Sequence, residues 1–218
     1  MSDGNIIKTI NSVERDYKNK HKYIVKFDSE EDIFLNEEIV FLNNIKPGSK
    51  FSLFELEKII DDDDYILCKN YAFNLTGRFS KTKKQLEDKL ISRGHNAKNI
   101  KKVLDLLQEY SLVNDEIYAK NYIISKLSKE GKEKISFELS LKGIPKDIIE
   151  NKFMELKEED EEIFHNSLMS AAKKKYTELV LRENDNRKIK EKLYSYLARK
   201  GFKWDEIKSC VNNILNGE

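Results

Sequence analysis

Few residues in this chain have the types and spacing that acid–base, nucleophilic or metal chemistry requires. The three histidines, His21, His95 and His165, stand in three different regions, and each is interpreted as a surface or interface residue rather than a ligand. Four consecutive aspartates, Asp61–Asp64, suggest a cation site, but they lack the alternating ligands, glycine and final glutamate of a calcium loop. A solvated helix boundary is the favoured interpretation of this run.

Other catalytic patterns are absent from the sequence. The segment Gly131–Lys134 lacks the first glycine, the spacing and the Ser/Thr of a phosphate-binding loop, and neither GxSxG nor HExxH occurs. Carboxylates are plentiful, but acid–base catalysis needs a converging pair in a shielded pocket, which abundance does not show. The sequence therefore predicts a protein that is not an enzyme, with no catalytic residue, metal site or cofactor.

The two cysteines, Cys68 and Cys210, lie far apart and have no second cysteine or histidine at metal-ligand spacing. They are predicted to be reduced and buried, as in a cytosolic protein. No apolar stretch approaches the roughly 18 residues of a membrane span, and the first ten residues have no signal-peptide pattern. We expect a cytoplasmic protein that does not bind membranes.

The elements that would position any site follow one pattern, which occurs three times. Two apolar residues four apart lie on one helical face, and a glycine one turn later, after a cation, indicates a helix stop. An isoleucine six residues past the glycine then opens the buried face of a second helix. The three copies are Leu86, Leu90, Gly94 and Ile100; Ile135, Leu139, Gly143 and Ile149; and Leu193, Leu197, Gly201 and Ile207. Such an array typically binds an extended partner.

The composition agrees with thin helical layers. Charged residues make up 36% of the 218 residues, the hydrophobic class makes up only 39%, and two prolines and eight glycines permit long helices. Alternation predicts strands at Ile6–Val13, Lys22–Phe27 and Asp32–Leu35, followed by a short helical piece near Glu37–Phe41. We expect these strands to form a small antiparallel sheet.

From residue 52 onward the sequence indicates helices. Ser52–Glu55 has the form of a capping box for a helix that ends near Ile60, and a separate helix is expected over 65–76. Thr82–Gln85 is a second capping box. Asn96 and Asp185 are predicted to cap later helices. About nine or ten helices are expected after the sheet.

Charge is unevenly spread along the chain. Residues 1–64 hold 9 basic and 15 acidic residues, whereas residues 65–149 hold 17 and 10, and residues 150–218 hold 14 of each. This asymmetry favours an anionic partner for the repeats, and ordinary helix-surface charge is the open alternative. The candidate partner-binding residues are Arg78, Lys81, Lys84, Arg93, Lys101, Lys102, Lys132 and Lys134.

Several segments in this order resemble the RecX family of regulators of the recombinase RecA. They are Tyr71–Arg78 with Lys84–Gly94, Leu112–Asp115 with Tyr118–Tyr122, Lys134–Ile144, and Lys192–Phe202. With the N-terminal sheet, which resembles that of Firmicutes-type members, the similarity covers nearly the whole chain. Two departures stand out: Ser111 replaces the family's glycine, which puts a left-handed turn there in doubt, and Asn114 replaces an aspartate but can still cap a helix.

The resemblance implies a mainly α fold, in which a small N-terminal antiparallel β-sheet precedes three tandem three-helix repeats in an elongated curved solenoid. The expected domains are 1–64, a β-rich domain with short helices, 65–128 for the first repeat, 129–184 for the second, and 185–218 for the C-terminal part of the third. The resemblance also implies a negative modulator that lodges in the groove of the RecA–DNA filament and inhibits strand exchange, ATP hydrolysis and co-protease activity. An autonomous DNA-binding helical-repeat protein is the alternative, and weak direct binding to single- or double-stranded DNA stays open.

Overall fold

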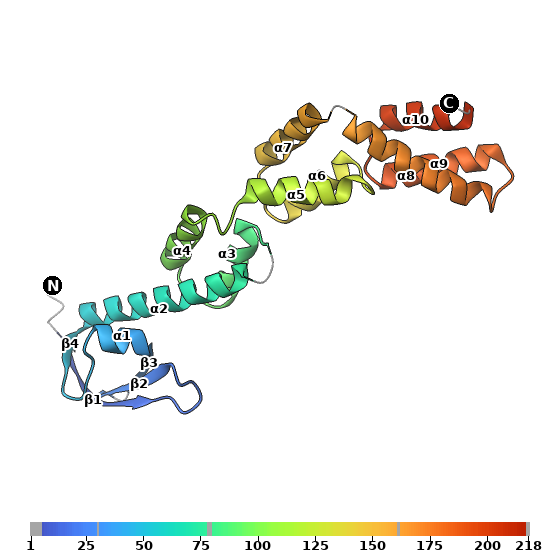
Figure 1. Cartoon of the computed structure of the whole chain (residues 1–218). Helices are drawn as coiled ribbons and strands as arrows, with labels where there is room; N and C mark the ends of the chain where they lie inside the picture. The colour runs from blue at the N-terminus through green and yellow to red at the C-terminus, as the bar shows by residue number, and fades with distance from the viewer. Residues whose placement is uncertain (1–5, 30, 78–79, 161, 217–218) are drawn as a thin grey trace. The chain divides into compact units, whose positions relative to one another are not determined.

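The computed structural model describes residues 6–29, 31–77, 80–160 and 162–216. Over these residues a small antiparallel sheet is followed by helices, which confirms the predicted fold class (Figure 1). Internal contacts divide the chain into two compact units. The first comprises residues 1–79 and 86–112, and the second comprises residues 80–85 and 113–218.

The first unit contains a four-stranded antiparallel sheet in the order β3-β2-β1-β4. Its strands are β1 (Ile7–Arg15), β2 (Lys22–Phe27), β3 (Asp32–Asn36) and β4 (Lys50–Ser52). The first three strands agree with the predicted segments. The sequence pattern misses β4, because three residues are too few to show alternation, and the strand forms only through pairing with the start of β1.

One face of the sheet is buried against helices of the same unit. Along β2, Val25 and Phe27 are buried while the alternate lysines stay partly exposed, as the alternation predicts. The predicted short helix is α1 (Glu37–Leu42), and Asn36 caps it by accepting a hydrogen bond from the amide of Glu38. Ile39 of α1 and Ile59 of the next helix complete this core.

That next helix, α2 (Leu53–Thr76), is continuous over 24 residues and begins with the predicted capping box between Ser52 and Glu55. The prediction that a helix ends near Ile60 is therefore wrong, as is the prediction of a solvated boundary at Asp61–Asp64. Aspartate charge lowers helix propensity only slightly and does not interrupt a helix that tertiary contacts hold. The boundary expected at residue 64 falls inside α2, and the limits of the four domains stay predictions.

The described residues form eight further helices: α3 (Lys83–Ser92), α4 (Ala97–Glu109), α5 (Asp115–Leu127), α6 (Lys132–Leu141), α7 (Lys146–Glu159), α8 (Ile163–Val180), α9 (Asn186–Arg199) and α10 (Trp204–Asn216). Asn96 and Asp185 cap α4 and α9 as predicted, and Asn114 caps α5. Ser111 adopts φ +55°, so the left-handed turn forms despite the missing glycine. Thr82 and Gln85 exchange the two hydrogen bonds of the predicted capping box.

The repeated apolar positions all lie in helices and are at most 3% exposed. Each glycine of the pattern ends its helix in the left-handed region: φ is +85° at Gly94, +80° at Gly143 and +82° at Gly201. An L-residue with a Cβ is strained in this conformation, so the helix stop depends on glycine. The helices α3, α6 and α9 are therefore three versions of the same local structure.

Within the second unit, two of these glycine turns contact the first residues of a helix from the preceding repeat. The turn at Gly143 contacts the start of α3, and the turn at Gly201 contacts the start of α6. The hydroxyl of Thr82 donates to the carbonyl oxygen of Lys142 (2.6 Å), and the side-chain stem of Lys84 lies directly against Gly143. At the second joint the amide of Gly131 donates to the carbonyl oxygen of Lys200 (2.7 Å). In both joints the positive end of one helix faces the negative end of another, which is favourable.

Candidate partner-binding surface

The structure does not bring the eight predicted basic residues together in one described site. Arg78 lies outside the described residues. Arg93, Lys101 and Lys102 belong to the first unit, and Lys81, Lys84, Lys132 and Lys134 belong to the second. A single binding face that contains all eight remains a prediction.

In the first unit, aromatic rings lie beside cations of the α3–α4 turn and of α4. The guanidinium of Arg93 lies 4.5 Å from the ring centroid of Tyr71, and the ammonium of Lys102 lies 5.8 Å from that of Tyr65. Lys101 is exposed on α4. A cation over a ring keeps its full charge, so these residues can meet a phosphate or a carboxylate on a partner.

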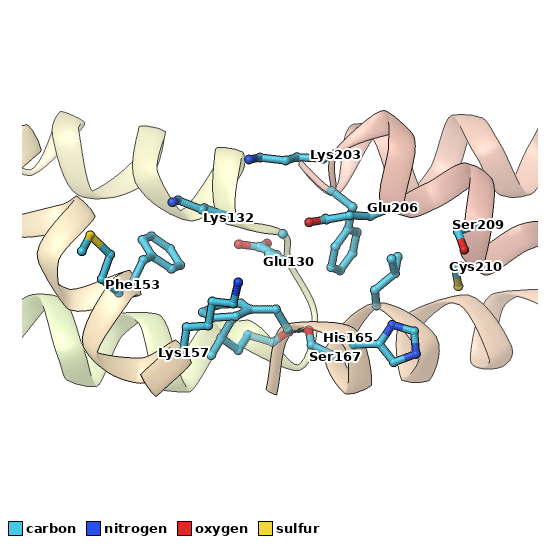
Figure 2. Close-up of a pocket in the computed structure, with 16 residues that line it drawn as sticks. Glu130, Lys132, Phe153, Lys157, His165, Ser167, Lys203, Glu206, Ser209 and Cys210 are labelled. Carbon is cyan, nitrogen blue, oxygen red and sulfur yellow. Dashed lines mark hydrogen bonds between the residues drawn. The ribbon is translucent and has the colours of Figure 1, made fainter. Parts of the chain in front are cut away.

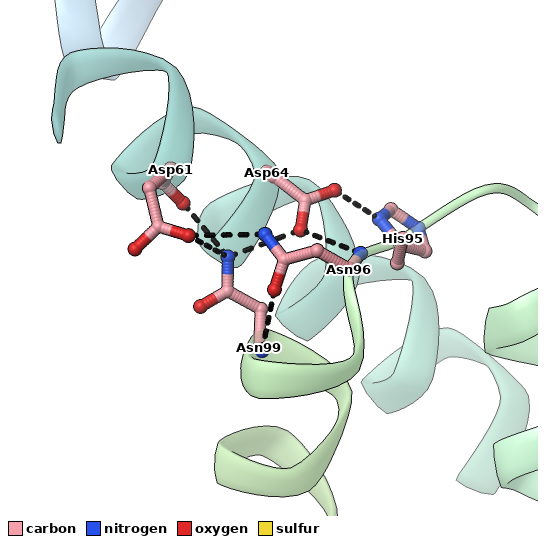
Figure 3. Close-up of polar contacts among 5 residues, drawn as sticks. All are labelled: Asp61, Asp64, His95, Asn96 and Asn99. Carbon is pink, nitrogen blue, oxygen red and sulfur yellow. Dashed lines mark hydrogen bonds and ion pairs between the residues drawn. The ribbon is translucent and has the colours of Figure 1, made fainter. Parts of the chain in front are cut away.

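A polar network holds α4 against the middle of α2 (Figure 3). The ring of His95 contacts the carboxylate of Asp64 at 2.8 Å, and the backbone amide of Asn96 donates to the same carboxylate. The side-chain amide of Asn99, which is fully buried, donates to both Asp61 and Asp64. The hydrogen bond from Lys98 (2.7 Å) lowers the pKa of Asp61.

The aspartates of this run thus link α2 to neighbouring elements, and they do not mark the end of a helix. Asp63 faces the sheet, is only 6% exposed, and accepts a hydrogen bond from the amide of Asn36 at 2.5 Å. Burial raises the pKa of the Asp63 carboxyl. No group of three or more His, Cys, Asp and Glu side chains that could hold a metal occurs in the part of the chain that the structure describes.

In the second unit, the joints cover part of the predicted basic side chains. Lys84 is exposed overall, but its Cβ packs on Gly143. The backbone and Cβ of Lys134 pack on Gly201, and its ammonium pairs with Glu130 at 2.8 Å. Both lysines therefore support the fold as well as contributing charge, which the helical spacing alone does not reveal.

A tyrosine and a glutamate that the sequence analysis does not single out organise the basic side chains beside α6. The Tyr122 hydroxyl donates to Glu138 at 2.6 Å, and the ammonium groups of Lys126 and Lys142 lie 5.5 and 5.4 Å from its ring centroid. Burial raises the pKa of Tyr122, and the hydrogen bond from Tyr122 lowers the pKa of Glu138. At neutral pH the tyrosine is a neutral donor and the glutamate a fixed anion.

A cavity of about 460 Å³ lies in the second unit between the α5–α6 turn, α7, the start of α8 and α10. In Figure 2 Glu130 occupies the centre of the view, with Lys132 and Lys203 above it and Lys157 below. Lys132 lies 5.2 Å from the ring centroid of Phe153. Glu130 is 8% exposed, and its Oε2 has no hydrogen-bond partner among the described residues, although the ammonium of Lys126 lies 3.6 Å away. The walls combine apolar side chains with lysines and with the carboxylates of Glu130 and Glu206, and no hydrogen bond joins a nucleophile to a base among the described lining residues.

The remaining residues that could carry chemistry are two histidines and the two cysteines. His21 contacts Glu37 at 2.7 Å, and His165 lines the cavity from an exposed position. Both cysteines are free and buried, as predicted. Burial raises the pKa of Cys68 to about 12 and also raises that of Cys210, so both thiols stay protonated and weakly nucleophilic. No helix in the described ranges is long and apolar enough to cross a membrane.

Comparison with known proteins gives a consistent result. Residues 114–151 match the family model described as RecX, second three-helix domain, and residues 161–211 match that of RecX, third three-helix domain. A protein of Clostridium tetani named regulatory protein RecX is 33% identical over 99% of this chain and 98% of its own length. A protein of the same name from Clostridioides difficile is 34% identical over 95% and 96%. These relatives are named as regulatory proteins rather than as enzymes.

Two solved structures share the fold. A crystal structure of regulatory protein RecX has a TM-score of 0.67 at 18% identity, and covers 94% of this chain and 99% of its own. A crystal structure of RecX from Lactobacillus salivarius has a TM-score of 0.62 at 26% identity, over 70% of this chain and 97% of its own. The first likeness concerns the fold alone.

Proposed function

The chain belongs to the RecX family, and from this premise we propose that it is a negative modulator of the RecA recombinase. It binds in the groove of the RecA–DNA filament and inhibits strand exchange, ATP hydrolysis and co-protease activity. The observation that carries this proposal is the near full-length similarity to proteins named regulatory protein RecX, at 33% identity over 215 residues.

The described residues support a mechanism based on binding. Three-helix units with repeated buried positions offer extended helical surfaces, and such surfaces can contact several protomers of a polymer at once. Contacts with several protomers raise the effective affinity without a deep pocket. Exposed cations on α4 suit an acidic protein surface or DNA phosphates within the filament.

The direct test is RecA-driven strand exchange with and without this protein. We expect inhibition at fewer than one chain per RecA protomer, because an inhibitor that engages a filament affects many protomers. Unchanged strand exchange at an excess of this protein over RecA would reject the proposal.

Autonomous DNA binding is the second candidate, and the balance of 17 basic to 10 acidic residues over 65–149 favours it. It predicts tight binding to DNA without RecA, with an affinity that falls steeply with salt. Fluorescence anisotropy with labelled single- and double-stranded DNA at ~50 and ~200 mM salt separates the two candidates. We expect weak binding, since the whole chain carries a net charge of only +1.

A further inference from the structure

The outward face of α6 carries two large apolar side chains that the fold does not cover. Phe137 is 62% exposed and Leu141 is 71% exposed. They are four residues apart, so they lie one above the other on the helix. The opposite face of α6 buries Ile135 and Leu139 completely. These two residues are called the α6 pair below.

The other two repeats show that the fold does not need apolar residues here. Measured from the buried leucine and the glycine, Phe137 corresponds to Asp88 in α3 and to Ser195 in α9. Leu141 corresponds to Ser92 and Arg199 by the same spacing. All four counterparts are exposed and polar. The same local structure therefore forms with polar side chains, and packing does not explain the α6 pair.

Basic residues lie near the Leu141 end of the α6 pair, along the chain or through the turn at Gly143. Lys84 packs on Gly143, two residues beyond Leu141, and Lys142 follows Leu141 directly. Lys146, at the start of α7, has a side chain that is 89% exposed and pairs with Glu150 at 3.5 Å. Of the two glutamates in α6, Glu133 is exposed, whereas Glu138 is held by Tyr122 and Lys126. Two exposed apolar side chains are thus followed, at the Leu141 end, by basic residues of the α6–α7 turn and by Lys84.

We propose that the α6 pair is the apolar anchor of a protein-docking surface. Its occupant is a protein subunit with an apolar depression bordered by carboxylates. This inference rests on the proposed function, in which that subunit is a protomer of the RecA filament. Interfaces are typically anchored by a few large side chains that become fully desolvated at the centre, with charges at the rim. The α6 pair and its lysines have this arrangement.

The chemistry disfavours nucleic acid as the occupant of this surface. A phosphate backbone gains nothing from the exposed aliphatic side chain of Leu141, and a phosphate contact would bury that side chain against charge. Phe137 alone could stack on a base, but it would then leave Leu141 without a partner. An apolar depression on a protein accommodates both side chains together.

The double variant Phe137→Ser with Leu141→Arg tests the anchor, because it installs the residues that the third repeat already carries at these positions. Binding is measured to RecA filaments assembled on single-stranded DNA with a non-hydrolysable ATP analogue. Truncation of an anchor should weaken binding by at least ~10-fold, while the thermal unfolding curve stays that of the wild type. The matched control is Ile124→Ser, which removes an exposed apolar side chain (50% exposed) from α5, which lies with α6 in the matched region 114–151.

The possible outcomes distinguish the docking role of the α6 pair from the proposed function. Wild-type affinity in the double variant overturns the anchor and leaves the proposed function intact. No binding of the wild type to filaments overturns the proposed function, and the occupant with it. An equal loss in the control overturns the assignment to α6. If the double variant loses affinity for bare single-stranded DNA to the same extent, the occupant is nucleic acid and the proposal is wrong.

Discussion

Four glycines at helix ends, three that stop a helix and one, Gly131, that begins α6, allow the backbone conformation and the close approach at the repeat joints to be separated. Gly94 has positive φ but open space around its Cα, so a Cβ there meets nothing within 4 Å. Gly131 has an ordinary φ of −83°, but a Cβ there would overlap the backbone of Gly201 and Phe202. At Gly143 and Gly201 positive φ and close approach coincide, and at Gly201 a Cβ would lie 2.5 Å from the amide nitrogen of Lys134.

Substitution of each by alanine should therefore have graded effects. A left-handed L-residue costs about 1–2 kcal/mol, which is the whole cost expected at Gly94. Forced overpacking costs about 1–3 kcal/mol, which is the cost expected at Gly131. At Gly143 and Gly201 the two costs combine to about 2–5 kcal/mol, with Gly201 the more severe because backbone atoms cannot rotate away.

Urea unfolding of the four variants, followed by circular dichroism, measures these free energies. We expect the largest loss of unfolding free energy at Gly201 and Gly143, and the smallest at Gly94. If Gly143→Ala and Gly201→Ala cost no more than Gly94→Ala, the glycines serve only to end helices. The close joints between successive repeats would then contribute nothing measurable.

Three further predictions concern the first unit. Asn99→Ala should cost about 1–3 kcal/mol of unfolding free energy, because it removes the hydrogen bonds that this buried side chain donates to the carboxylates of Asp61 and Asp64; an unchanged urea midpoint would contradict the role of this network. The pKa of Asp63 is raised in the folded state. As pH rises from the unfolded-state pKa of ~3.9 through the folded-state pKa, the wild type should therefore lose stability relative to Asp63→Asn. Unfolding curves between pH 3 and 7 measure this, and a difference that does not vary with pH would refute it. Charge reversal of Lys101 and Lys102 together should weaken filament binding at low salt more than at high salt, whereas an effect independent of salt would exclude an electrostatic contact.

Local sequence signals account for much of the fold. Caps such as Asn96 and Asp185 and the three glycine stops are decided by residues within one helical turn, so their spacing is sufficient to predict them. The buried apolar positions are predicted equally well, because apolar residues four apart lie on the same face of a helix. Ser111 shows the limit of such rules, since tertiary packing holds a serine where the local preference is for glycine.

The features that the sequence does not reveal depend on distant partners. Nothing near Asp63 indicates that it binds the amide of Asn36, 27 residues away. Helical periodicity assigns Lys84 and Lys134 to an outward face, but it cannot show that a glycine of the next repeat lies against each stem. The same holds for the candidate site: the basic residues were identified by type, and their division between two units follows only from the fold.

The most direct measurement of the central claim is a titration of this protein into cognate RecA hydrolysing ATP on single-stranded DNA. We expect that hydrolysis by RecA falls at substoichiometric ratios, and that the protein alone hydrolyses no ATP. Undiminished RecA hydrolysis at an excess of this protein, or ATP hydrolysis by the protein itself, would contradict it.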